Sequence, residues 1–216
     1  MSTCQELQEK IKHLKNLQSE FEQIYGALPA GSNRDQGKRE VLAQVNEKRD
    51  EIELMIEQIE KLLYWKKIKL GTFRTVNELR QAILDQGDRI SPWCKKMMEK
   101  TELSQSEIKV YLMTATTKEL TGKDKATYQE IKDAIIDHGG ELCPAEVGLQ
   151  LRLQYQDQPI GESLMIVMES LFDHNGEPRI WAISSYIDPL LDSVDGQSNS
   201  RVVAGHRWVY CVNKHK

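Results

Sequence analysis

The chain has 216 residues, of which 39 % are hydrophobic and 29 % are charged, and its formal net charge is −4. This composition is typical of folded globular proteins and excludes a largely disordered chain. No apolar run approaches the roughly 20 residues that a membrane-spanning helix needs. The first residues, MSTCQELQEK, lack the apolar core of a signal peptide. We therefore expect a cytoplasmic protein with no membrane partner.

The charges are unevenly divided along the chain. Residues 1–69 hold 12 Lys and Arg against 12 Asp and Glu, which leaves 17 basic and 21 acidic residues in 70–216. Binding to a phosphate backbone requires clustered Lys and Arg. Because the larger part of the chain is acidic, we expect no nucleic-acid partner.

Two amphipathic helices are predicted at residues 5–25 and 38–68, on either side of the linker GALPAGSNRDQG. Apolar residues recur in them at spacings of three, four and seven, with Lys48 at one position of the same stripe. These apolar residues are Leu7, Ile11, Leu14, Phe21, Tyr25, Val45, Ile52, Met55, Ile59 and Leu62. The pattern predicts a hairpin within the chain or a coiled coil between chains. We expect residues 1–69 to form this oligomerisation element, and the protein to be a homo-oligomer.

The second part of the chain, residues 70–216, alternates short helices and strands. Thr75 and Glu78 form a predicted capping box at the start of a helix that Gly87 ends, and Ser91-Pro92 starts a second short helix with Trp93, Met97 and Met98. We expect these two helices to pack under a sheet, since no basic recognition face follows them. Residues 108–115 alternate in the manner of a strand.

The segment Ala126–Tyr155 predicts a compact helix, turn and helix. Thr127 and Glu130 form another capping box, Gly139-Gly140 ends the first helix, and Pro144 suits the first turn of the second. Three strands are predicted after it, at 163–171, 179–185 and 206–212. An Asn-Gly pair in Asp173–Gly176 predicts a hairpin between the first two, and residues 186–205 form a predicted long loop.

Motifs for catalysis are few. The sequence has no glycine-rich phosphate loop, GxSxG or HExxH motif, and its histidines are dispersed. Cys4, Cys94, Cys143 and Cys211 are far apart, which is typical of reduced, buried thiols. We therefore expect no metal, no cofactor and no enzymatic activity. The alternative is a small hydrolase with a cleft near Cys143 and Asp157.

Aromatic and small polar residues gather near the C-terminus, a combination that recognition surfaces use. We expect this region to bind a protein or another macromolecular ligand. The predicted ligand-binding residues are Trp181, Ser184, Ser185, Tyr186, Asp188, Ser198, Asn199 and Arg201. Trp181 and Trp208 could instead fill the core.

The stretch GGELCPAEVGLQLRLQY, with the helix ATYQEIKDAI before it and a hairpin and aromatic strand after it, resembles the core of C-type-lectin-like domains. The segments TVNELRQAI, ELCPAEVG and LRLQYQDQPIGE look similar to uncharacterised bacterial proteins. These in turn resemble variable proteins of diversity-generating retroelements. The likeness covers about residues 70–216. The disulfides and the Glu-Pro-Asn calcium motif of secreted lectins are absent, as is the paired cysteine arrangement of formylglycine-generating oxidases.

The resemblance implies an α+β fold, in which a C-type-lectin-like domain of two helices and a small antiparallel sheet follows the helical hairpin. It also implies a non-enzymatic binding module with a mutable C-terminal recognition surface. A third possibility is a phage- or host-defence adaptor that acts through the coiled coil.

Overall fold

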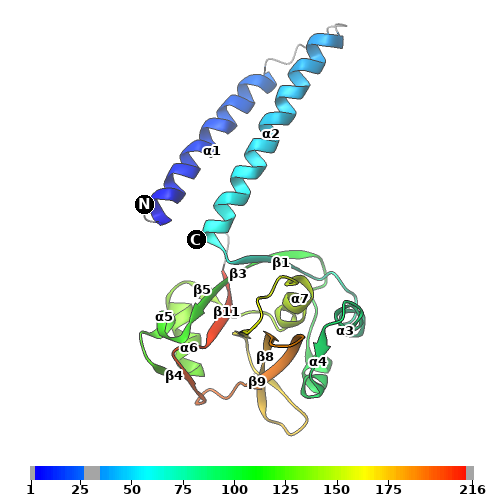
Figure 1. Cartoon of the computed structure of the whole chain (residues 1–216), viewed down its shortest axis with the longest axis vertical. Helices are drawn as coiled ribbons and strands as arrows, with labels where there is room; N and C mark the ends of the chain where they lie inside the picture. Colours follow the sequence, from blue (N-terminus) through cyan, green and yellow to red (C-terminus); the bar gives the residue numbers. More distant parts are fainter. Residues whose placement is uncertain (1–2, 27–34, 213–216) are drawn as a thin grey trace. The chain divides into compact units, whose positions relative to one another are not determined.

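A computed structural model of the chain describes residues 3–26 and 35–212 (Figure 1). The chain divides into two compact units, Met1–Trp65 and Lys66–Lys216. The second unit begins at Lys66 because Lys66–Leu70 forms a strand, β1. The sequence pattern predicted a helix that continues to residue 68, and this end of the prediction was wrong. The greater part of the predicted linker, residues 27–34, lies outside the described residues.

The first unit is a helical hairpin of α1 (Thr3–Gly26) and α2 (Asp35–Leu63). The helices are antiparallel, because Lys10 Nζ donates to Gln58 Oε1 at 2.8 Å while Lys48 Nζ lies 3.0 Å from Glu20 Oε2. This confirms the hairpin within the chain. Leu17, which the sequence interpretation did not single out, is only 4 % exposed and lies in the interface between the helices.

The predicted apolar stripe of the first helix differs from the observed interface near its C-terminal end. Tyr25 is 59 % exposed, so it lies beside the stripe rather than in it. A regular heptad alternation through Leu14, Leu17 and Phe21 reaches Ile24 instead, and Ile24 is half-buried. The side chains of Leu7 and Leu62 lie outside the described residues.

The second unit is a mixed α+β domain. Its helices are α3 (Val76–Asp85), the 3₁₀ turn η1 (Pro92–Cys94), α4 (Lys95–Lys100), α5 (Thr117–Thr121), α6 (Tyr128–Asp137) and α7 (Glu146–Gln154). After β1, its strands are β2 (Arg89–Ile90), β3 (Ile108–Thr116), β4 (Lys125–Thr127), β5 (Gly140–Glu141), β6 (Glu162–Ile166), β7 (Leu171–Phe172), β8 (Pro178–Ser185), β9 (Pro189–Asp195), β10 (Arg201–Val203) and β11 (Arg207–Val212).

The main sheet has the strand order β1-β3-β11-β6-β8-β9-β2, with β5 at β11 and β7 at β8. Its neighbours are antiparallel except for β11 with β6 and β2 with β9. The last strand, β11, pairs with β3, which itself pairs with β1, so the two ends of the domain meet in one sheet. β10 and β4 form a separate pair.

Local signals in the sequence set several element boundaries. Thr75 and Glu78 form the predicted capping box at α3, and Thr127 and Glu130 form the one at α6. The Asn-Gly hairpin joins β7 to β8, and Gly176 there has a φ of 79°, a conformation that glycine tolerates best. The predictions of both caps and of this turn are confirmed.

The strands around the predicted loop differ from the expectation. Residues 186–205 are not one loop, because Pro189–Asp195 forms β9 and pairs with β8 along its whole length. Arg201–Val203 forms β10 against β4. The predicted strand at 163–171 is divided, since β6 ends at Ile166 and β7 begins at Leu171.

Helix α7 lies in the centre of the domain, in contact with α3, β1, β8 and β9 (Figure 1). Residues Glu146 to Arg152 are all buried, so polar as well as apolar faces of this helix are covered. Gly148 allows the close approach to β8, because a Cβ there would lie 2.4 Å from Cγ and Cδ1 of Trp181. The core of the domain therefore contains a helix whose first seven residues, about two turns, are covered on all sides.

The buried polar groups of α7 bind the connections around it. Arg152 Nε donates to Asp88 Oδ2 at 2.8 Å, and Arg152 Nη2 donates to the carbonyl of Tyr155 at 2.7 Å. Glu146 accepts from the backbone N–H groups of Gly71 and Ser104 at 2.7 and 2.8 Å. These bonds satisfy groups that would otherwise be costly to bury, and they hold the connections that flank α3 and α4 to α7.

Candidate functional site

Three of the eight predicted ligand-binding residues are buried. Trp181 has no exposed surface, and Ser184 and Ser185 are 7 % and 6 % exposed. The reason is that β8 lies between β6 and β9 and residues Ile180 to Ser185 are buried on both of its faces. Trp181 is a core residue, and within the described part of the chain its Nε1 has no hydrogen-bond partner. These three side chains are therefore unsuited to direct contact with a ligand.

The five exposed predicted residues fall into two groups. Tyr186 and Asp188 lie in the turn between β8 and β9, whereas Ser198, Asn199 and Arg201 follow the opposite end of β9. Seven residues of strand separate the two groups, which corresponds to about 20 Å at the usual rise per residue. They do not form one continuous surface.

The second group belongs to a segment that is tied to α6. The carbonyls of Ser198 and Ser200 accept from the N–H groups of Gln129 and Tyr128 at 3.0 and 2.9 Å. Ser200 Oγ also donates to the Asp195 carboxylate. The first N–H groups of a helix have no partner within the helix, so this segment has a clear structural role at the start of α6.

The first group adjoins an exposed apolar surface. Tyr186 and Ile187 are 64 % and 91 % exposed, and Ile160 is 86 % exposed. Gly161 N donates to the Ser185 carbonyl at 2.6 Å, which places the loop carrying Ile160 against the β8–β9 turn. We refer to Ile160, Tyr186 and Ile187 as the turn surface. Asp188 lies 3.7 Å from Arg89 in an exposed ion pair beside it.

The side chains of the turn surface are exposed, but the backbone that carries them is held by continuous strand pairing. The strands that lead into it pair without interruption from Ser185↔Pro189 back to Arg179↔Asp195. Glu162 pairs with Ser185 on the other side. Of these three residues, only Tyr186 was among the predicted ligand-binding residues. Ile160 and Ile187 could have been found as apolar residues in turn segments that otherwise consist mainly of polar residues, Pro and Gly.

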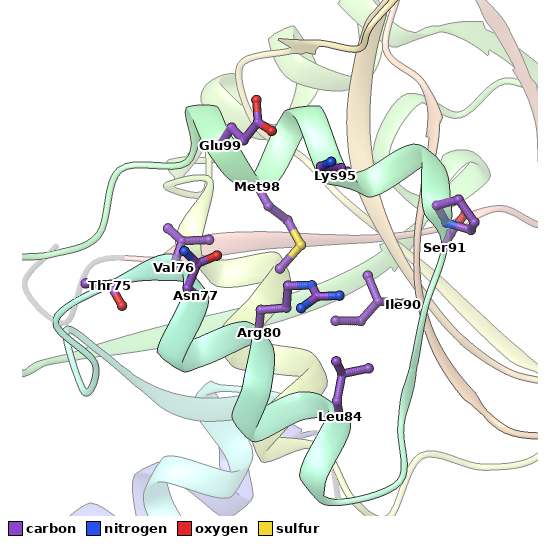
Figure 2. A pocket seen from close by; sticks show the side chains of 11 residues that line it. Thr75, Val76, Asn77, Arg80, Leu84, Ile90, Ser91, Lys95, Met98 and Glu99 are labelled. Carbon is purple, nitrogen blue, oxygen red and sulfur yellow. The ribbon is translucent and has the colours of Figure 1, made fainter.

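A pocket of about 760 Å³ lies between α3 and the η1–α4 segment. Arg80 of α3 and Met98 of α4 point toward each other across it, with Leu84 and Ile90 beside them (Figure 2). Its volume is in the range of small-molecule sites. The sequence interpretation predicted only the packing of these helices under the sheet and did not predict the pocket.

The residues of the alternative hydrolase site are chemically unsuited to that role. Burial raises the pKa of the Cys143 thiol well above its usual value, and its Sγ lies 3.5 Å from Cys211 Sγ. A nucleophilic cysteine needs a lowered pKa and access to solvent. A hydrogen bond from Lys66 lowers the pKa of the exposed Asp157 carboxyl, which favours a structural ion pair over acid–base chemistry.

Burial also raises the pKa of the Cys94 thiol, to about 12. Cys94, Cys143 and Cys211 are all buried and free of disulfides. Over residues 3–26 and 35–212, no cluster of three or more His, Cys, Asp or Glu side chains could hold a metal ion. The same residues include no helix with the length and apolar character needed to cross a membrane.

No protein-family model matches the chain, and neither a curated protein nor a solved structure matches it.

Proposed function

We propose that the domain after Lys66 is a non-enzymatic binding module that recognises a protein partner through the turn surface. The observation that carries this proposal is the exposure of three neighbouring apolar side chains, of which Ile160 and Ile187 are 86 % and 91 % exposed. The hydrogen bond from Gly161 N to the Ser185 carbonyl brings the two backbone segments that carry them together. Exposed apolar side chains that gather on one part of a surface are typical of protein interaction sites. Tyr186 supplies a large contact area at a low cost in conformational entropy.

The scaffold of this module is, in our proposal, C-type-lectin-like. Support comes from the pairing of β11 with β3 beside β1, which joins the ends of the domain, and from the two helices α6 and α7 before the β6–β8–β9 strands. A relation to variable proteins of diversity-generating retroelements predicts a reverse transcriptase gene and a near-repeat of the 3′ coding end in the source genome. A complete genome without both would contradict that relation.

We further propose that the hairpin assembles with a second copy of itself. The residues that directly follow the d positions of a heptad are the e positions. In an antiparallel pair, the e positions of both helices lie along the same edge of the interface between the helices. This edge holds Ile11, Tyr25, Leu42, Ile56 and Leu63, which are between 37 % and 59 % exposed, together with the polar residues Gln18 and Arg49. The opposite edge holds His13, Glu20, Gln44, Glu51 and Gln58. The apolar edge supports a homo-oligomer, which would display several turn surfaces and raise avidity.

The oligomer is tested by measuring molar mass with light scattering. Replacing Leu42 and Ile56 by Asp together should reduce the mass to that of one chain, because charges would enter the apolar edge. Replacing His13 and Gln44 by Asp is the matched control on the polar edge and should leave the mass unchanged. A wild-type mass equal to one chain at all concentrations would contradict the proposal.

The recognition surface is tested by photo-crosslinking in cells of the source organism. A photoreactive phenylalanine analogue is placed at Ile187, and at Asn199 as an exposed control near the other end of β9. We expect one discrete crosslinked protein from position 187 and none of the same mass from 199. A discrete crosslinked protein from position 199, with none from position 187, would place recognition in the group of Ser198, Asn199 and Arg201 and overturn the proposal.

A further inference from the structure

The pocket between α3 and α4 has walls that the fold fixes in place. The capping box of Thr75 and Glu78 fixes the start of α3, and Thr101 Oγ1 donates to the Met97 carbonyl at the end of α4. Between the two helices, Ser91 N donates to the Leu191 carbonyl at 2.9 Å and holds η1 to β9. A ligand would therefore meet a site that exists before binding, which reduces the cost of association.

The interior of the pocket is mostly apolar. Val76 and Leu84 come from α3, Ile90 from β2 and Met98 from α4. Met98 is 4 % exposed, and the other three are partly exposed. These side chains can cover an apolar or aromatic body, and the thioether of Met98 adapts readily to its shape.

The charges at the pocket are mainly positive. Arg80 and Lys95 line it, and the one acidic residue in its lining is Glu99. Glu99 is already engaged, because Lys96 Nζ lies 2.7 Å from its carboxylate and this hydrogen bond lowers its pKa. Figure 2 shows the Glu99 carboxylate directed away from Arg80. The pocket is thus locally cationic in a protein whose net charge is −4.

The Arg80 guanidinium is available to a ligand. Among the described residues it has no hydrogen-bond or ion-pair partner, and it extends into the pocket (Figure 2). A guanidinium presents parallel N–H donors that match the two oxygens of a carboxylate. Lys95 adds a second positive charge at the same pocket, which favours an anion over a neutral polar group.

From these observations we propose that the pocket binds a small organic carboxylate with an apolar body. The carboxylate pairs with Arg80, Lys95 supplements its charge, and the body lies between Leu84, Ile90 and Met98. A cation is repelled at this site. A free inorganic anion makes no use of the apolar walls.

Phenylbutanoate is a suitable probe, since it combines a carboxylate with a short apolar chain and a ring. Its binding to the full-length protein is followed by NMR, with phenylbutanamide and inorganic phosphate as matched compounds. We expect shift changes at Arg80, Ile90 and Met98, and an affinity at least about tenfold higher for the carboxylate than for the amide. Equal affinities for carboxylate and amide, or for phosphate and phenylbutanoate, would overturn the proposal, as would an absence of shifts at the pocket.

Two arginine variants separate the pocket from general surface charge. Arg80→Gln should weaken phenylbutanoate binding about tenfold, because a charge-assisted hydrogen bond is lost. Arg74→Gln is the control, since Arg74 is exposed and does not line the pocket. Lys95→Gln provides a second test and should weaken binding to a smaller degree. Equal affinities of the Arg80→Gln and Arg74→Gln proteins, both folded by thermal melting, would contradict the site.

Discussion

Helix α7 and the turn surface have opposite distributions of polarity. In α7, a glutamate, a glutamine and an arginine are buried with 1 % or less of their surface exposed, whereas the turn surface exposes two isoleucines and a tyrosine. Every buried charge of α7 has a partner, so these residues serve the architecture. The apolar side chains of the turn have no such cover. The paired charges of α7 therefore serve the structure, and the exposed apolar side chains of the turn surface are the ones to which our proposal assigns recognition.

The largest expected effect is at Arg152. Replacing Arg152 by Leu leaves Asp88 buried without its cation and removes the donors to Gln158 and Tyr155. Breaking one side of a buried pair costs about 3–5 kcal/mol. Chemical denaturation measures this loss. Arg74→Leu, at an exposed site, should change the free energy of unfolding by about 0.5 kcal/mol or less, and a similar small value for Arg152→Leu would refute the structural role of α7.

A smaller loss is expected at Gly148. An alanine there must displace the Trp181 ring, since the added Cβ would lie 2.4 Å from it. Overpacking of this kind costs about 1–3 kcal/mol and exceeds the helix propensity that alanine gains. Gly205→Ala is the matched control, because no atom lies within 4 Å of the position of its Cβ. A Gly148→Ala protein as stable as the Gly205→Ala protein would mean that α7 and β8 are packed less closely.

The third prediction concerns Glu130 at the start of α6, near the segment of Ser198 and Asn199. Its pKa is lowered from 4.5 to about 2, mainly by the hydrogen bond from Lys123 and then by the N–H of Thr127. A lowered pKa in the folded state adds stability above the unfolded pKa, and this contribution is lost as the pH falls from about 4.5 toward 2.

Thermal melting of the wild type and of Glu130→Gln should therefore differ by a constant amount above about pH 5, and by less at each lower pH. In a Lys123→Gln background the pKa of Glu130 should lie closer to its usual value, because the hydrogen bond from Lys123 is the largest cause of its lowering. The pH range over which the stability difference changes should therefore be narrower. A difference that does not depend on pH would contradict the assignment. The effect should be small, since the ion pair with Lys123 is exposed.

The elements that the sequence predicted well depend on neighbouring residues. Capping boxes such as Thr127 with Glu130, and the Asn-Gly turn before β8, act within a few residues and are visible in any window. Strand β9 was missed because its sequence PLLDSVD has polar residues that become half-buried only when β8 pairs beside it. Tertiary context overrides strand propensity in this way.

The candidate sites were harder to predict for a related reason. The turn surface combines Ile160 with residues 26 and 27 positions further along the chain, and the pocket combines Arg80 with Met98 from another helix. Neither set has a fixed spacing in the sequence. The prediction that Ser184 and Ser185 bind a ligand was wrong. Small polar residues are typical of recognition loops, but these two lie in a strand that is covered on both faces.

The most direct test of the account is a comparison of stability and partner affinity at the turn surface. Once the crosslinked partner is purified, its affinity is measured for the wild type and for a variant with Tyr186→Ala and Ile187→Ser. We expect the free energy of unfolding to change by about 0.5 kcal/mol or less per substitution. The affinity should fall by about 2 kcal/mol or more.

An Asn199→Ala variant should match the wild type in both respects. A large loss of stability with unchanged affinity in the turn variant would show that these side chains serve the fold, and it would contradict the account.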